Sequence, residues 1–370
     1  MIKILFFIPN LSVGGAEKVL VNLVNNMDKS KYSITVMTLF GNGVNEQFLN
    51  SDIRLITCYK KPFKGNHFIF KLFSPQHLFK KFIKDDYDII VSYLEGTAAR
   101  IVSGCNNDKT KLVCWIHVEQ HTENTASICF RNFEESKKCY EKFDKIICVS
   151  EYVKKDFISI YHNIKNVDVL YNTNETSQII EKSKEQVKDE LFDNEEIKIC
   201  AVGSLKKVKG FDRLIRIQKK LADEGLKTKF YVLGTGSEKR NLEELARANS
   251  LEDLFLLLGY HANPYKYIKR CNLFTCASTA EGFSTAATES LILGVPVVTV
   301  DVSGMKEMLG ENNEYGIVTE NNEDALYEGI KKMLTTPGML EDYAERAKER
   351  GKEFSTEKTV MAVEEMFTRL

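Results

Sequence analysis

Short apolar runs alternate with helix-length segments along the whole chain, and this alternation constrains the fold more than any other feature of the sequence. Segments with helical spacing, such as residues 16–26, separate several of the runs. Strands that alternate with helices in this way predict parallel sheets with helices on both faces. The runs that we predict as strands are residues 2–8, 33–39, 88–92, 111–116 and 145–149 in the first half and residues 197–202, 229–233, 254–258, 273–276 and 297–300 in the second.

A polar, charged stretch at residues 172–196 separates the two series of strands. The 370 residues are enough for two cores, since domains usually span about 100–200 residues. The expected fold class is therefore α/β, with two doubly wound parallel-sheet domains. Because such sheets bind ligands at the carboxyl ends of their strands, we expect the ligand in a cleft between the domains.

Composition argues against several classes of protein. The 51 lysines and arginines balance the 52 acids, so nothing indicates a nucleic-acid partner. The nine cysteines form no Cys-x-x-Cys pair, which argues against a zinc knuckle or a disulfide framework and favours a reducing cytoplasm. No run reaches the roughly 18 apolar residues of a membrane span, and the first run is too short for a signal peptide. We therefore expect a cytoplasmic chain, which could still bind the inner face of the cell membrane.

The stretch at residues 280–300 combines a glycine loop with the start of a short helix. Ser284 or Thr285 can cap that helix, and Gly294 predicts its end. Free backbone N–H groups and the positive end of a helix dipole attract phosphate, and Gly282 lets the main chain approach an anion closely. The stretch therefore predicts a diphosphate site.

Two glutamates, Glu281 and Glu289, flank this predicted site. A largely helical step of eight residues would place their carboxylates on the order of 10 Å apart, which suits two ends of one ligand better than a shared proton. Glutamates at this spacing also occur as ordinary solvated helix charges. The surrounding residues favour the functional interpretation, because they supply a Glu-Gly-Phe start, a small residue after the second Glu and a Gly-x-Pro-Val end. In these elements the stretch resembles the donor-site signature of the retaining glycosyltransferases of family 4.

The resemblance implies the fold called GT-B, with two Rossmann-like domains. Residues 1–171 would form an acceptor-binding domain, residues 172–352 a nucleotide-sugar-binding domain, and residues 353–370 a terminal helix that packs back on the first domain. The implied reaction moves a hexose or N-acetylhexosamine from a nucleotide-diphosphate sugar, with UDP favoured over GDP, to a saccharide or a polyprenyl- or lipid-linked acceptor. It retains the anomeric configuration and serves the biosynthesis of bacterial surface polysaccharides, such as capsule, or of glycolipids.

The resemblance also assigns roles within the predicted donor site. Glu281 would hold the donor sugar and Glu289 the ribose. Lys209 and backbone amides would stabilise the departing diphosphate, so we expect no metal or other cofactor. An Asp-x-Asp at residues 86–88 abuts a strand start and is interpreted as a turn. The residues expected around the diphosphate are Gly282, Phe283, Ser284 and Thr285.

Lys209 lies in a glycine loop between a predicted strand and a helix, which is typical of a phosphate-binding loop. The family pattern here is Gly-Arg-Leu-x(3)-Lys-Gly, and both basic residues grip the diphosphate. Ser204 stands in the position of the arginine. Lys206 or Lys207 could substitute, but an ammonium group is not a bidentate guanidinium. We therefore expect weaker donor binding or a different diphosphate pose.

Two further loops of the second half resemble parts of the family's donor site. Gly234 belongs to a Gly-x-Gly-x-Glu turn after the strand at residues 229–233. Tyr260 and His261 follow the strand at residues 254–258, where related enzymes place the nucleobase. We expect these residues to contribute to nucleotide binding.

In the first half, Gly14 and Gly15 lie between the first strand and the first helix. Adjacent glycines let backbone amides approach a ligand at a helix start, although they also suit a plain tight turn. A dinucleotide-binding Gly-x-Gly-x-x-Gly is absent, which argues against an NAD-dependent epimerase. The Gly-Gly-Ala-Glu string resembles the family's amino-terminal signature, which faces the donor phosphates and the acceptor.

His117 follows the predicted strand at residues 111–116. Chemistry collects at the carboxyl ends of such strands, but a lone histidine is more often a hydrogen-bonded structural residue. The resemblance implies a histidine here that lines the site beside the transferred sugar, with His121 and Glu119 as weaker candidates. We therefore assign catalytic roles to His117, Glu281 and Lys209.

Residues 59–84 interleave seven lysines with six phenylalanines. Cations beside apolar residues on an amphipathic segment suit the headgroup region of an anionic membrane, where a lipid-linked acceptor would reside. An ordinary helix with inward phenylalanines and solvated lysines explains the pattern equally well.

Two other functions compete with glycosyl transfer. One is an epimerase or phosphorylase of the same architecture. The other is a catalytically silent nucleotide-sugar-binding subunit of a glycosyltransferase pair, which the serine at position 204 suggests.

Overall fold

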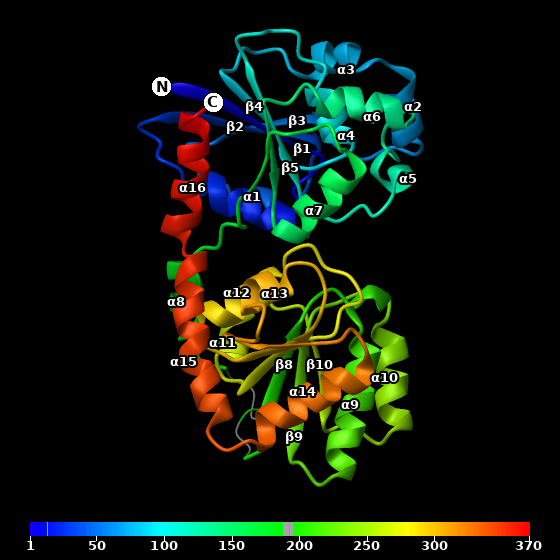
Figure 1. Ribbon diagram of the computed structural model, residues 1–370, viewed down its shortest axis with the longest axis vertical. Coiled ribbons are helices and arrows are strands. Elements are labelled where there is room, and N and C mark those ends of the chain that lie inside the picture. Colours follow the sequence, from blue (N-terminus) through cyan, green and yellow to red (C-terminus); the bar gives the residue numbers. More distant parts are fainter. Residues whose placement is uncertain (13, 188–191, 193–194) are drawn as a thin grey trace. The chain divides into compact units, whose positions relative to one another are not determined.

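Two parallel sheets organise the chain, one in each of two units, as the computed structural model shows (Figure 1). The structure describes residues 1–12, 14–187, 192 and 195–370. Unit 1 comprises Met1–Asn174 and Thr356–Leu370, and unit 2 comprises Glu175–Ser355. Every strand pair in both sheets is parallel, which confirms the predicted α/β class with two doubly wound sheets.

The unit 1 sheet has seven strands in the order β3-β2-β1-β4-β5-β6-β7. The five predicted strands are present, with ends that differ by at most one residue. Two edge strands, β3 and β7, were not predicted, because β3 is largely exposed and β7 has only three residues. The bounds are β1 (Ile2–Ile8), β2 (Tyr32–Phe40), β3 (Arg54–Tyr59), β4 (Ile89–Ser92), β5 (Lys111–Ile116), β6 (Lys145–Cys148) and β7 (Val167–Val169).

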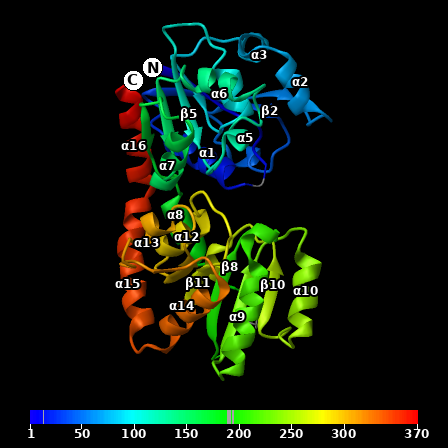
Figure 2. The same cartoon turned by 45° about the vertical axis from the view of Figure 1, so that its right-hand side comes forward.

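Helices cover both faces of this sheet, and α16 at the end of the chain runs beside α1 (Figure 2). Phe367 of α16 lies edge-on to Phe6 of β1, with 6.2 Å between ring centroids. The Thr356 hydroxyl donates to the Asn174 carbonyl at 2.6 Å, which ties the start of α16 to unit 1. The bounds are α1 (Gly15–Asn26), η1 (Glu46–Phe48), α2 (Asn66–Leu72), α3 (Pro75–Phe82), α4 (Thr97–Val102), α5 (Glu123–Ala126), α6 (Phe133–Tyr140), α7 (Glu151–Ile160) and α16 (Thr356–Thr368).

The unit 2 sheet has six strands in the order β10-β9-β8-β11-β12-β13. All five predicted strands are present, and only β13, a three-residue edge strand, was missed. The strands are β8 (Ile197–Val202), β9 (Thr228–Leu233), β10 (Phe255–Gly259), β11 (Leu273–Cys276), β12 (Val297–Val300) and β13 (Ile317–Thr319). The helices are α8 (Thr176–Ser183), η3 (Lys207–Lys209), α9 (Phe211–Asp223), α10 (Lys239–Ala248), α11 (Tyr265–Ile268), α12 (Thr285–Ile292), α13 (Met305–Leu309), α14 (Glu323–Thr335), α15 (Met339–Gly351) and η4 (Lys352–Phe354).

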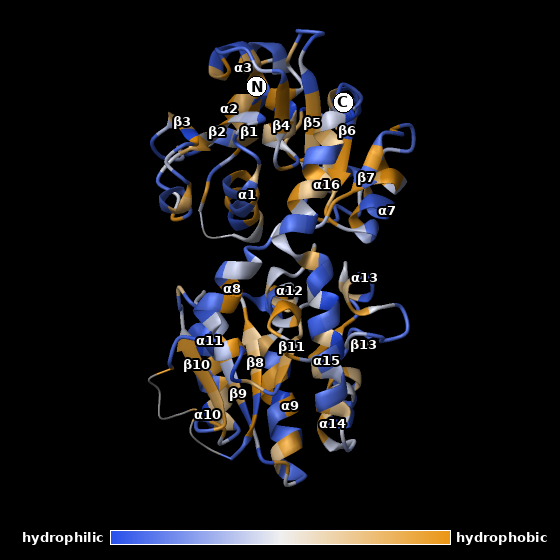
Figure 3. Cartoon of the chain, turned by 90° about the vertical axis from the view of Figure 1, so that its left-hand side faces the viewer, coloured by the Kyte–Doolittle hydropathy of each residue, from blue (hydrophilic) through white to orange (hydrophobic). Residues whose placement is uncertain are grey.

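Buried apolar strands form the core of each unit, and their colour in Figure 3 is largely hydrophobic. All nine cysteines are free thiols, and six of them are buried, in agreement with the expectation of no disulfide framework. Among the described residues, no helix is both long enough and apolar enough to cross a membrane.

Strand order reverses at one point in each sheet, and this determines which loops meet. In unit 1 the chain moves outward from β1 to β3 and then returns to the other side of β1 with β4. In unit 2 the same reversal lies between β8 and β11. Doubly wound sheets bind ligands at the carboxyl ends of the strands at such a reversal. The loops after these strands are therefore where each unit can build a site.

Candidate functional site

The loops that follow β8 and β11 meet in unit 2 through an ion pair. Lys209 lies in the first loop and Glu281 in the second, and their Nζ and Oε1 atoms are 2.6 Å apart. The lysine side chain is 25% exposed and the glutamate side chain 12%. The Ser278 hydroxyl also donates to the same Glu281 oxygen at 2.6 Å. The structure thus brings two of the predicted catalytic residues together.

Close backbone packing explains why Lys209 reaches this position. Gly210, which follows it, has φ +65°, and a Cβ atom there would lie 2.1 Å from the Ala277 carbonyl oxygen. Only glycine allows this approach. The Thr279 N–H also donates to the Val208 carbonyl at 2.8 Å, which joins the two loops a second time.

Helix α12 begins directly after the loop that carries Glu281. Ser284 is its N-cap, and the hydroxyl accepts the Ala287 N–H at 3.4 Å, as the sequence predicts. Phe283 is buried, with its ring centroid 5.8 Å from that of Phe354, so the loop is anchored in the core of unit 2. The first turn of a helix carries N–H groups without intrahelical partners, together with partial positive charge. The loop and the first turn, from Gly282 to Thr285, are therefore suited to an anion.

Glu289 lies on α12 but is buried, so it is not an ordinary solvated helix charge. The Tyr265 hydroxyl donates to its Oε1 atom at 3.3 Å. A buried carboxylate needs hydrogen-bonding partners, and a ligand hydroxyl could supply another.

The remaining predicted residues of unit 2 have different surroundings. Ser204 is exposed in the loop after β8. Gly234 has φ +146°, and a Cβ atom there would lie 1.8 Å from the Gly203 carbonyl oxygen, so the loops after β8 and β9 pack closely. Tyr260 is exposed, whereas the His261 Nε2 atom lies 3.2 Å from the Leu258 carbonyl oxygen. Of the two residues predicted to contact a base, Tyr260 is the more exposed.

In unit 1, His117 follows β5 and is held against the loop after β4. Its backbone N–H donates to Glu95 at 2.9 Å, and its ring centroid lies 5.1 Å from that of Tyr93. Burial lowers the pKa of the imidazole to about 3, which a hydrogen bond with the Tyr93 backbone only partly opposes. His117 is therefore neutral at physiological pH. Within the described part of the chain its Nε2 atom has no hydrogen-bond partner, so it can accept or donate one hydrogen bond to a ligand.

Glu95 was not predicted, although it lies beside His117. Burial raises the pKa of its carboxyl group, while the N–H groups of His117 and of Glu95 itself lower it. A single glutamate after a strand does not form a motif with a recognisable spacing. The partner of His117 was therefore not recognisable from the sequence, and neither were Ser278 and Tyr265.

Gly14 and Gly15 form the start of α1 in the same unit. Gly14 is extended, and a Cβ atom there would lie 2.0 Å from the Glu17 carboxylate, which folds back onto the loop. Burial raises the pKa of that carboxyl group. Gly14 has no side chain to cap the helix, and the Glu17 carboxylate accepts the Glu17 backbone N–H instead.

The described residues contain one group of side chains with metal-ligand spacing, Glu119, His121 and Asp156. One ligand atom from each lies within 4.8 Å of the others. Asp156, however, accepts the N–H groups of Gln120 and His121, at 2.7 and 3.1 Å to its nearer oxygens, so it anchors this loop. The Asp-x-Asp at residues 86–88 is also structural, because Asp88 accepts the Lys3 N–H at 2.8 Å.

Two known protein families match successive parts of the chain. "Glycosyltransferase Family 4" matches residues 13–178, and "Glycosyl transferases group 1" matches residues 182–350.

Two curated relatives are similar over almost their full length. The chain is 29% identical over 365 residues to the N-acetylgalactosamine-N,N'-diacetylbacillosaminyl-diphospho-undecaprenol 4-alpha-N-acetylgalactosaminyltransferase of Campylobacter jejuni, with 96% of each chain covered. It is 23% identical over 360 residues to the amylovoran biosynthesis glycosyltransferase AmsD of Erwinia amylovora, with 96% of this chain and 97% of that one covered.

A solved structure shares the fold. The Anabaena protein Alr3699/HepE in complex with UDP matches with a TM-score of 0.79 at 18% identity, over 100% of both chains. The same protein has been solved with UDP-glucose, and that structure matches with a TM-score of 0.77.

Proposed function

Since the chain belongs to glycosyltransferase family 4 and has the GT-B fold, we propose that it transfers a hexose or N-acetylhexosamine from a UDP-sugar to a lipid-linked saccharide. The observation that carries this proposal is the ion pair between Lys209 and Glu281 beside the start of α12. A cation and the amino end of a helix suit a diphosphate, and a carboxylate suits the hydroxyls of a sugar. All three groups lie at one edge of the sheet.

In the proposed reaction, the anomeric carbon loses its bond to the diphosphate and gains one to the acceptor oxygen on the same face. The acceptor proton leaves with UDP. Lys209 and the amides near Ser284 stabilise the charge that develops on the diphosphate, the role that a metal ion has in other transferases. Glu281 binds hydroxyls of the sugar, and Glu289 binds the ribose. Because the acceptor oxygen bonds on the face that the diphosphate leaves, the product retains the anomeric configuration, and we expect the reaction to need no metal.

The identity of the nucleotide is inferred from solved structures of the same fold. The Anabaena structures contain UDP and UDP-glucose. The exposed Tyr260 offers a ring on which either base can stack. We therefore favour UDP over GDP.

The acceptor is inferred from the names of relatives and from unit 1. The Campylobacter relative acts on an undecaprenol-linked saccharide, and the Erwinia relative serves a polysaccharide. The neutral His117 can hydrogen-bond a sugar hydroxyl without carrying a charge. We propose an acceptor of this lipid-linked class, used at the inner face of the cell membrane in surface-polysaccharide biosynthesis.

A transfer assay tests the proposal directly. The purified chain is incubated with an undecaprenyl-diphosphate-linked saccharide and one of four labelled donors: UDP-glucose, UDP-galactose, UDP-N-acetylglucosamine or GDP-mannose. We expect label in the lipid fraction with one UDP-sugar, unchanged by EDTA, and an anomeric proton coupling that shows retention. Glu281→Ala should reduce the transfer rate strongly, and Glu252→Ala, which removes an exposed acid before β10, should not.

The same assay separates the competing functions. Ser204 is exposed where the family has an arginine, which favours a silent binding subunit as the second candidate. Such a subunit would be stabilised by UDP against heat but would transfer no label. An epimerase would convert the UDP-sugar without an acceptor, and a phosphorylase would require phosphate. If Glu281→Ala were as active as the parent chain, the site assignment would be wrong.

A further inference from the structure

Helix α2 has apolar side chains on two sides, and only one side is packed. Phe70 is buried in an aromatic cluster, and its ring centroid lies 5.9 Å from that of Phe63 and 6.0 Å from that of Phe82. Phe68 and Leu72, four residues apart, are 77% and 76% exposed. The core of unit 1 therefore accounts for some of the phenylalanines between residues 59 and 84. It does not account for those that face outward.

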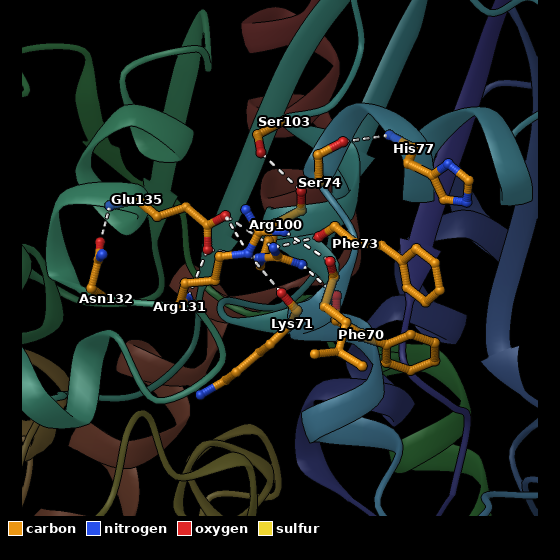
Figure 4. A network of polar contacts seen from close by, with 11 residues as sticks. Phe70, Lys71, Phe73, Ser74, His77, Arg100, Ser103, Arg131, Asn132 and Glu135 are labelled. Atoms are coloured by element: carbon orange, nitrogen blue, oxygen red, sulfur yellow. Dashed lines mark hydrogen bonds and ion pairs between the residues drawn. The ribbon is translucent and has the colours of Figure 1, made fainter.

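A second observation shows that this exposure is not due to a frayed helix. Arg100 of α4, which is 1% exposed, donates to the carbonyls of Phe70 at 2.9 Å and Phe73 at 2.8 Å (Figure 4). Arg131, just before α6, donates to the carbonyls of Lys71 at 2.7 Å and Leu72 at 3.0 Å. Four successive carbonyls at the end of α2 thus accept bonds from two guanidinium groups.

Glu135 of α6 holds both arginines in place. Its two carboxylate oxygens each lie 2.9 Å from a nitrogen of Arg100, and its Oε2 atom accepts the Arg131 backbone N–H at 2.7 Å. Burial raises the pKa of Glu135, but the hydrogen bonds from Arg100 and from the Arg131 backbone, with the charges of both arginines, lower it below its usual value overall. A helix of seven residues is not stable by itself in water, so this network and the packing of Phe70 together fix α2 in the fold.

The chain segment that contains α2 carries only positive charge. Between residues 55 and 84 the sequence has seven lysines and no acid. Lys64 lies two residues before α2, and Lys71 lies in its last turn. Within the described chain none of the seven lysines forms an ion pair with a carboxylate, and most are exposed. The seven are Lys60, Lys61, Lys64, Lys71, Lys80, Lys81 and Lys84.

We propose that α2 docks the protein on an anionic lipid bilayer, with Phe68, Ile69 and Leu72 inserted at the boundary between headgroups and acyl chains. The lysines then contact acidic headgroups. Apolar side chains flanked by lysines are the combination that such a surface attracts, whereas a protein partner for seven lysines would have to supply a matching acidic face. The Arg100–Glu135–Arg131 network keeps α2 folded before it binds, so the helix loses little conformational entropy when it contacts the bilayer. The surface is additional to the donor site and does not depend on it.

Vesicle flotation of the full chain tests this docking. One set of vesicles contains phosphatidylglycerol and phosphatidylethanolamine, and the other contains phosphatidylcholine alone. We expect flotation with the first set only, weakened by raised salt because exposed charges are screened. The double variant Phe68→Ser, Leu72→Ser should lower the apparent affinity at least about tenfold, since burying each side chain is worth more than a factor of ten. No donor or acceptor is present, so a failure of the proposed transferase function leaves this test unchanged.

Matched variants elsewhere in unit 1 serve as controls. Phe48→Ser, Ile128→Ser replaces two apolar side chains that are 54% and 69% exposed, and it should float like the parent chain. For the charges, Lys60→Gln, Lys61→Gln, Lys64→Gln should reduce flotation strongly. The exposed set Lys109→Gln, Lys142→Gln, Lys165→Gln should have little effect.

Three results would overturn the proposal. The first is equal binding to both vesicle sets, and the second is no binding to either. The third is that the parent chain is a dimer, that the Phe68→Ser, Leu72→Ser variant is a monomer, and that neither binds vesicles. The exposed face of α2 would then be an interface with a second copy of the chain. Circular dichroism and the melting temperature verify that each variant is folded, which is expected because the replaced side chains are exposed.

Discussion

The carboxyl edges of the two sheets, close to the strand reversal, carry different electrostatics. In unit 2, Lys209 and Glu281 are charged, paired and partly exposed. In unit 1, burial keeps His117 neutral beside Glu95, whose pKa burial raises. A charged edge suits an anionic ligand, and the neutral, desolvated imidazole of His117 suits sugar hydroxyls. The comparison indicates that one topology can prepare two kinds of site because the loops, and not the strands, determine the charge.

The largest expected effect concerns the charged edge. Lys209→Ala should lower kcat/KM by about a hundredfold to a thousandfold, the range for removing a group that stabilises developing charge. Because Lys209 and Glu281 form an ion pair, the double variant with Glu281→Ala should lose much less than the product of the two single losses. A double-mutant cycle of transfer rates measures this coupling. Independent effects would show that the pair does not act as a unit.

The next effect concerns His117 and the dependence of folding stability on pH. The pKa of His117 is about 3 in the folded chain, below the ordinary value of about 6.5, so the unfolded chain binds more protons between these values. Folding stability should therefore fall as the pH decreases from about 6.5, by roughly 3 kcal/mol at pH 4. His117→Asn should remove this fall.

Urea unfolding at several pH values compares the parent chain with His117→Asn. The raised pKa of Glu95 acts in the opposite direction, since its contribution is lost as pH rises, but it is present in both chains. His162→Asn, at an exposed histidine of unit 1, should keep the pH dependence of the parent. An unchanged slope in His117→Asn would mean that its imidazole is not buried in a neutral form.

A smaller effect concerns the affinity of unit 2 for UDP. Ser204→Arg restores a guanidinium group in the loop after β8, and we expect UDP to bind about tenfold more tightly, as one added charge-assisted hydrogen bond allows. Isothermal titration measures the dissociation constant. Thr336→Arg, at the end of α14, adds the same charge far along the chain and should leave the constant unchanged. If both variants gained equally, net charge would explain the change.

The smallest effect compares helix caps in the two units. Ser284 caps α12 in unit 2, and Ser150 caps α7 in unit 1. Each serine-to-alanine variant should destabilise its unit by about 1 kcal/mol. Only Ser284→Ala should also weaken UDP binding, because only α12 begins at the proposed diphosphate site. Urea midpoints and UDP titrations of both variants measure the two quantities, and equal UDP affinity would separate α12 from the donor site.

Much of the fold could be predicted from local sequence. Strands β1, β5, β8, β11 and β12 have the predicted bounds to the residue, because buried parallel strands are continuous apolar runs. The edge strands β3, β7 and β13 were missed, since an exposed or three-residue edge has no such run. The Ser284 cap was predicted because a serine before a helix is a local signal.

The sequence by itself determined which residue types follow each strand, and it therefore identified Lys209, Glu281 and His117 as candidates. Only the tertiary structure decided their partners. Lys209 and Glu281 are 72 positions apart, and they meet because β8 and β11 are neighbours in the sheet. The Glu95 contact of His117 and the Arg100 network that holds α2 likewise depend on strand order and helix packing. Periodicity reports the face that a residue occupies, whereas contacts between distant segments, and the burial that shifts a pKa, exist only after the chain has folded.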